Sequence, residues 1–103
     1  MFRVVFEIYR LPELTHEQFS ERYRRHGPLV RAFPGVLRYT QCLVTGSVNL
    51  LGPEADAISI LDFDSKDDYH RADASPEMQA AHDDAASFVS RVAAYYVDPR
   101  EVP

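Results

Sequence analysis

One histidine of the chain, His26, lies in the sequence where it could act as a catalytic acid or base. His26 comes directly before a Gly-Pro pair, and it follows Phe19 and Tyr23 at the helical spacings i, i+4 and i+7. Carbonyl groups at a helix end favour the charged imidazole, whereas burial favours the neutral one. We therefore expect an imidazole that exchanges protons near neutral pH. A histidine that only hydrogen-bonds helix-end carbonyls is the structural alternative.

Tyr39 is the second candidate, and it shares one face of a predicted strand with Gln41. If that face looks toward the helices, the phenol and the amide point toward His26. A phenol is a suitable hydrogen-bond donor to an oxygen that gains negative charge. A tyrosine that only packs in the sheet is the structural alternative. We predict His26 and Tyr39 as catalytic residues and Gln41 as a substrate-binding residue.

Two further residues are predicted to contact a substrate. Tyr23 shares the inward face of the helix with His26. Asp62 has the same parity as Ile58 and Ile60 in a predicted strand, and a carboxylate on an apolar stripe needs a partner or a place at the rim. An exposed aspartate at a strand end is the structural alternative for Asp62.

The composition excludes several other functions. Eleven Lys and Arg against sixteen Asp and Glu give a net charge of −5, which argues against a nucleic-acid or anionic-membrane binder. The single cysteine, Cys42, excludes an internal disulfide framework and a multi-cysteine zinc site. His16, His70 and His82 fall at predicted solvated helix positions without metal-ligand spacing, so we expect no metal and no cofactor.

The length of the chain indicates a single domain over residues 1–103. No apolar run approaches the roughly 18 residues of a membrane span. The first residues begin a strand rather than a signal peptide, so we expect a cytoplasmic protein.

Periodicity and capping signals predict the elements that position these residues. Thr15 and Gln18 have the spacing of a capping box, and the helix that they begin is expected to end at Gly27-Pro28, with a fresh turn after it. The predicted order is strand 2–10, this helix, strand 36–44, strand 56–63, a short helix after Ser65, a helix from Ser75-Pro76 to about Ala86, and strand 92–97. That order indicates an α+β, ferredoxin-like split βαβ fold, with a four-stranded antiparallel sheet and helices on one face.

Both faces of the predicted sheet carry apolar residues. Val5 and Tyr9 lie opposite the apolar face of strand 2–10, and Cys42 and Val44 lie opposite that of strand 36–44. A sheet with one side in water shows cleaner alternation. Because the helices cover only one face, we expect a second copy of the sheet to cover the other, in a two-fold homodimer.

Two segments carry a resemblance to a known family. The stretch LTHEQFSERYRRHGPLVRAFPGVLRYTQ resembles the signature half of the EthD family, with a capped helix, then HGPLV, then PGV-RY-Q at the second strand. The stretch DFDSKDDYHRADASPEMQAAHDDAASFV is similar to the family's FDS…ASPE…D-A–FV segment. The resemblance covers about residues 2–97.

The resemblance implies a dimeric α+β barrel, in which each subunit holds a cleft between its sheet and its helices. It also implies that the histidine of HGP and the tyrosine of RY act together, and these are His26 and Tyr39 in this chain. Many relatives carry an acidic residue and then a tryptophan in the third strand, where this chain has Ile60 and Asp62. This departure puts the identity of the substrate in doubt.

Three hypotheses for function follow. The first is a cofactor-independent isomerase, dehydratase or cyclase, in which His26 removes a proton next to the carbonyl of a small cyclic or aromatic substrate and Tyr39 stabilises the enolate oxygen. The second is a cofactor-free oxygenase of phenolic or anthrone substrates. The third is a non-catalytic small-ligand binder or accessory protein of a degradation or biosynthetic pathway.

Overall fold

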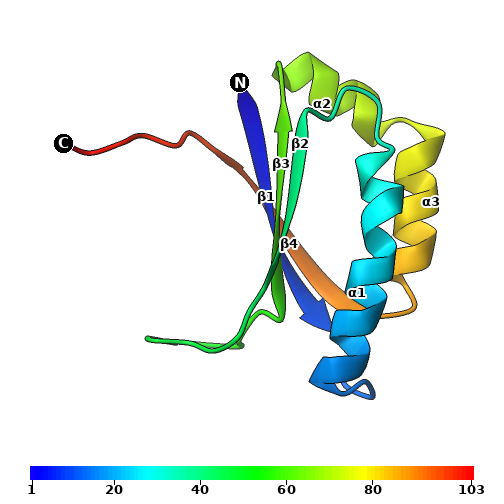
Figure 1. Cartoon of the computed structure of the whole chain (residues 1–103), viewed down its shortest axis with the longest axis vertical. Helices are drawn as coiled ribbons and strands as arrows, with labels where there is room; N and C mark the ends of the chain where they lie inside the picture. The colour runs from blue at the N-terminus through cyan, green and yellow to red at the C-terminus, as the bar shows by residue number, and fades with distance from the viewer.

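A computed structural model describes the whole chain, residues 1–103, and Figure 1 shows a sheet with its helices gathered on one side. The elements in chain order are β1 (Phe2–Arg10), α1 (His16–Arg31), β2 (Arg38–Leu43), β3 (Ala57–Phe63), α2 (Lys66–Asp73), α3 (Pro76–Ala85) and β4 (Val89–Val97). The four strands are antiparallel in the order β2-β3-β1-β4. This is the predicted ferredoxin-like α+β fold.

The period of two in the strands decides which side chains face the helices. On β1, Val4 and Ile8 are buried, and their β3 partners in the register are Leu61 and Ala57, which are also buried. Tyr39 pairs with Leu61 and therefore belongs to the same helix-facing side. The alternation in the sequence predicted that Tyr39 and Gln41 share one face, and the register shows that this face looks toward the helices.

The capping signals at the start of α1 are confirmed. The Gln18 backbone N–H donates to Thr15 Oγ1 at 3.1 Å, and the Thr15 N–H donates to Gln18 Oε1 at 2.8 Å. This reciprocal pair satisfies two N–H groups that a helix start leaves free. It also sets the rotational phase of α1, which turns Phe19, Tyr23 and His26 toward the sheet.

The prediction that this helix ends at Gly27-Pro28 is wrong. α1 continues to Arg31 with Pro28 inside it, and Gly27 has no positive φ. Pro28 lacks an N–H, so the turn before it loses one backbone hydrogen bond. The buried side chains of Val30 and Phe33 pack into the core just beyond this point, and we attribute the continuation of the helix to that packing.

Two strand boundaries also differ from the prediction. β2 covers only Arg38–Leu43, and β4 begins at Val89, after the three-residue turn 86–88 that follows α3. The Leu37 N–H still donates to the Asp62 carbonyl at 2.8 Å, so pairing continues one residue before β2. The helices at Ser65 and Ser75 begin as predicted, since each serine hydroxyl accepts a hydrogen bond from a first-turn N–H.

The core lies between the sheet and the helices in two clusters. The larger cluster joins α1, β3, α2 and α3 and contains Val30, Phe33, Val36, Leu61, Phe63, Ala72, Met78 and Ala81. The smaller cluster lies toward the other end of the sheet and contains Ile8, Phe19, Tyr23, Ala57 and Phe88.

The opposite face of the sheet has no helix over it. Val5 and Ile60 pair at its centre and are half-buried, while Tyr95 remains 53% exposed. Figure 1 shows that residues 98–103 and the loop between β2 and β3 extend on this side, away from the helices. We call this surface the open face.

Among the helices, none combines the length and the hydrophobicity that a membrane-spanning segment requires.

We expect Phe63→Ala to lower the free energy of unfolding by about 3–5 kcal/mol, because the substitution removes a fully buried ring from the larger cluster. Urea unfolding at a fixed protein concentration measures the change. Glu13→Ala is the control, since Glu13 is exposed in the turn before α1, and it should change stability by less than about 0.5 kcal/mol. Equal stabilities of the two variants would contradict the assignment of the core.

Candidate active site

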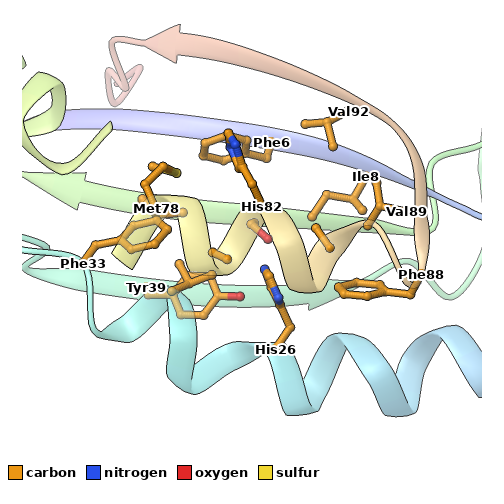
Figure 2. Close-up of a pocket in the computed structure, with 15 residues that line it drawn as sticks. Phe6, Ile8, His26, Phe33, Tyr39, Met78, His82, Phe88, Val89 and Val92 are labelled. Atoms are coloured by element: carbon orange, nitrogen blue, oxygen red, sulfur yellow. The ribbon is translucent and has the colours of Figure 1, made fainter. Parts of the chain in front are cut away.

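A cavity of about 160 Å³ lies between the sheet and the helices, and Figure 2 shows the side chains that line it. Twelve of its fifteen lining residues are hydrophobic, and the other three are His26, Ser59 and His82. Two of the residues that α3 contributes are Ala81 and Ala85, whose short side chains leave room opposite the sheet. The site is therefore a mostly apolar hollow that contains a few polar groups.

His26 enters the cavity from α1, and one of its ring nitrogens is already occupied. Its Nδ1 lies 2.8 Å from Asp84 Oδ2, at the end of α3. An ionised carboxylate only accepts hydrogen bonds, so Nδ1 donates the proton and Nε2 keeps a lone pair. The His26 residue is 8% exposed, and Figure 2 shows the tip of its ring pointing into the cavity. In the neutral ring, Nε2 is the nitrogen that can act as a base.

Tyr39 enters from β2, and its hydroxyl is held by Gln41. Gln41 Nε2 lies 2.7 Å from the Tyr23 carbonyl oxygen and 2.9 Å from the Tyr39 hydroxyl oxygen. A carbonyl can only accept, so this end of the amide is the NH₂ group, and its second hydrogen is given to the Tyr39 oxygen. The Tyr39 oxygen is thus an acceptor toward Gln41, and its own proton remains available to a substrate. Figure 2 shows this hydroxyl pointing toward His26.

Burial keeps the Tyr39 phenol protonated. Removal from water raises the pKa of Tyr39 above its ordinary value of about 10, and the hydrogen bond from Gln41 opposes part of that shift. Because the neutral phenol is the hydrogen-bond donor, the shift favours the form that can stabilise an oxyanion at neutral pH.

Gly27 allows the strand and the helix to come this close. A Cβ atom at this position would lie 3.4 Å from Gln41 Nε2 and 4.0 Å from the Tyr39 ring. Any side chain larger than that of alanine would therefore meet the amide that holds the Tyr39 hydroxyl. The Gly27-Pro28 pair thus serves this close approach instead of ending α1.

The structure brings only two of the five predicted site residues to the cavity wall, His26 and Tyr39. Gln41 and Tyr23 lie behind the wall. The Tyr23 hydroxyl is 2.7 Å from Ser59 Oγ, and burial raises the pKa of this phenol strongly. We had expected both residues to contact the substrate directly, and the structure places them as supports for Tyr39 and Ser59.

Asp62 is not in the cavity, so the expectation that it contacts a substrate there is corrected. Its parity with Ile58 and Ile60 turns it to the open face, where Arg3 donates to both of its carboxylate oxygens at 2.7 and 3.1 Å. Those hydrogen bonds lower the pKa of Asp62. The buried carboxylate therefore has the partner that its apolar neighbours require.

The sequence reasoning missed two residues of the site, Asp84 and His82. Asp84 is 58 positions from His26 in the chain, and no spacing rule links them. The sequence does contain a pattern that indicates His82, because Met78, Ala81, His82 and Ala85 have the helical spacing i, i+3, i+4 and i+7. That spacing places His82 on the inward stripe of α3, where the structure has it lining the cavity.

The arrangement provides a base, a hydrogen-bond donor for an oxyanion and a dry wall around both. It provides no metal site, since no three His, Cys, Asp or Glu side chains gather in ligating geometry. None of the lining residues is Lys or Arg, so the wall holds no permanently charged group that would pair with a carboxylate or a phosphate group.

Comparisons with known proteins agree with this fold. The model of the EthD domain family matches residues 11–91. An EthD family protein from Bacillus halodurans superposes with a TM-score of 0.79 at 22% identity, over 97% of this chain and 100% of that one. A dimeric ferredoxin-like protein from Thermobifida fusca gives 0.72 at 19%, over 93% and 88%.

SnoaB, a cofactor-independent oxygenase from Streptomyces nogalater, superposes with a TM-score of 0.64 at 15% identity, over 98% of this chain and 92% of that one. A comparison with curated proteins finds no match. At these identities the solved structures show the shared fold alone.

We expect Gln41→Leu to raise the pKa of Tyr39 further, because the substitution removes the hydrogen bond that stabilises the phenolate. NMR of protein labelled at tyrosine Cζ follows each ring during an alkaline titration, and Tyr39→Phe identifies the Tyr39 signal. Gln79→Leu, on the exposed side of α3, is the matched control and should leave the signal unchanged. A lower Tyr39 pKa in Gln41→Leu would contradict the hydrogen-bond assignment.

Proposed function

The chain belongs to the EthD family, and from that premise we propose that it is a cofactor-independent acid–base enzyme acting on a small cyclic or aromatic carbonyl compound. The observation that carries the proposal is that His26 and Tyr39 line one apolar cavity, each with its chemical group held by a neighbour and directed inward.

The cavity supports a neutral substrate with a single ring. Its volume of about 160 Å³ is below the roughly 300–1,000 Å³ of sites that hold drug-sized ligands. The hydrophobic wall favours an apolar ring, and the absence of Lys and Arg from the wall disfavours an anion.

Proton abstraction is assigned to His26. Its Nε2 removes a proton from the carbon next to the carbonyl group, and the C–H electron pair becomes the enolate. The imidazolium that forms is stabilised by the Asp84 carboxylate on Nδ1. Asp84 has a side chain that is 44% exposed, so the charge of the carboxylate remains hydrated while only the imidazole is buried.

Tyr39 stabilises the enolate oxygen by donating its hydroxyl proton in a hydrogen bond. The donor is held in place before the reaction, and the mostly apolar wall offers few competing hydrogen bonds, so the interaction strengthens as charge develops on the oxygen. Return of the proton to another carbon gives isomerisation, and departure of a leaving group gives dehydration. Attack of the enolate within the same molecule gives cyclisation.

We expect His26→Gln to lower turnover by about 10²–10⁴-fold and Tyr39→Phe to lower it by about 10²-fold or more. The probe is α-angelica lactone, a neutral five-membered lactone, and its isomerisation is followed by proton NMR. His70→Gln is the matched control, because His70 is exposed on α2 and does not line the cavity. Thermal unfolding checks that each variant remains folded.

Full activity of His26→Gln would overturn the assignment of the base. A thermal shift on binding, with no turnover of lactones, cyclic ketones or phenols, would identify a non-catalytic small-ligand binder instead.

The second candidate is a cofactor-free oxygenase, and the dry wall of the cavity favours it specifically. In that reaction His26 would remove a phenolic proton, and the electron-rich anion would itself transfer an electron to O₂. SnoaB shares the fold and is a cofactor-independent oxygenase. Oxygen uptake with an electron-rich single-ring phenol, lost in His26→Gln, would select this reaction over isomerisation.

We infer that the protein is a homodimer that pairs through the open face. Half-buried Val5 and Ile60 at the centre of that face support this, as does the dimeric ferredoxin-like protein from Thermobifida fusca. A contiguous apolar surface of this kind marks an association site.

We expect Ile60→Glu to convert the dimer to a monomer, because two carboxylates would be buried near the two-fold axis. Light scattering coupled to size-exclusion chromatography measures the mass. Ala80→Glu, on the exposed side of α3, is the matched control and should remain dimeric. A monomeric wild-type protein would contradict the inference.

A further inference from the structure

A second histidine stands at the mouth of the cavity. Of the fifteen lining residues, only His82 on α3 and Val92 on β4 are exposed, so the cavity opens to solvent between these two elements. His26 is held by Asp84, whereas the His82 ring makes no hydrogen bond to another protein group. His82 therefore lies where a ring bound in the cavity would meet solvent.

The two histidines come to the cavity from different helices, His26 from α1 and His82 from α3. Tyr39 lies on β2, while Phe6 and Val92 lie on β1 and β4, which are two and three strands away. Figure 2 shows His82 reaching from α3 toward the part of the cavity that Phe6 lines, while His26 and Tyr39 enter from α1 and β2.

We propose that His82 is a second catalytic residue, which gives a proton to the γ-carbon of the substrate after His26 has removed one from the α-carbon. The proposal rests on the proposed function. It narrows the substrate to a β,γ-unsaturated cyclic ketone or lactone. In such a compound one saturated carbon separates the carbonyl carbon from the carbon–carbon double bond.

The reaction balances without an oxidant or a reductant. His26 Nε2 takes the proton from the carbon between the carbonyl group and the double bond, and the electron pair spreads over a dienolate whose oxygen accepts the Tyr39 hydrogen bond. Protonated His82 then gives its proton to the γ-carbon, where a new C–H bond forms, and the double bond moves into conjugation. His26 has gained one proton and His82 has lost one, and exchange with water restores both.

The position of His82 is more than a solvated helix site requires. It lies on the inward stripe of α3 with Met78, Ala81 and Ala85, all of which line the cavity. His82 is the one ionisable residue at the mouth of the cavity, and it lies beside an apolar wall. A ring bound in the cavity would therefore contact its imidazole.

The test separates the two proton transfers with α-angelica lactone in D₂O. Proton NMR follows deuterium entering the α-carbon, which reports on removal by His26, and formation of the conjugated β-lactone, which reports on delivery to the γ-carbon. We expect His82→Gln to keep α-exchange within about twofold of wild type and to lose conjugated product by about 10²-fold or more. His70→Gln is the control and should change neither rate.

Wild-type formation of the conjugated product by His82→Gln would overturn the role of His82 while leaving the proposed function intact. Equal loss of both rates in this variant would also overturn it, because His82 would then act in binding. Absence of both reactions in the wild-type protein would instead remove the proposed function, and the role of His82 with it.

Discussion

The hydrogen bond between His26 and Asp84 is the interaction on which the site depends. An imidazole within an apolar layer needs a polar partner, because a buried nitrogen without one costs about 1–3 kcal/mol. Asp84 supplies that partner at 2.8 Å from the end of α3, while its own side chain remains 44% exposed. The pair therefore escapes most of the desolvation cost of a fully buried ion pair. It also joins α1 to α3 at the edge of the cavity and fixes the tautomer of the ring.

Much of the fold and the two central site residues were predictable because they depend on local periodicity. The capping box at Thr15 sets the phase of α1, and a spacing of seven residues then turns His26 inward together with Phe19. The alternation of β2 puts Tyr39 on the side of the sheet that faces the helices. Two independent periodicities thus converge on one cavity, and neither requires knowledge of the other.

The remaining features depend on contacts between distant segments. Local sequence preferences predict that a helix ends at Gly27-Pro28. In the structure, buried side chains on both sides of this pair favour a continuous helix. The sequence gives Asp84 no feature that distinguishes it from a surface residue, because its contact with His26 forms only when α1 packs against α3. The carboxylate of Asp62 suggested a site residue from its chemistry. The alternation along β3, however, places Asp62 on the open face with Ile58 and Ile60, where Arg3 binds it.

The cavity itself is the strongest reason to regard the chain as more than a stable fold. Filling such a hollow with larger side chains would add on the order of a few kcal/mol of stability, and a domain of this size has only about 5–15 kcal/mol in total. The two core clusters lie on either side of it, and alanines at 81 and 85 keep it open. Since leucine would suit the helical pattern equally well at both positions, the folding of the chain alone does not explain the hollow.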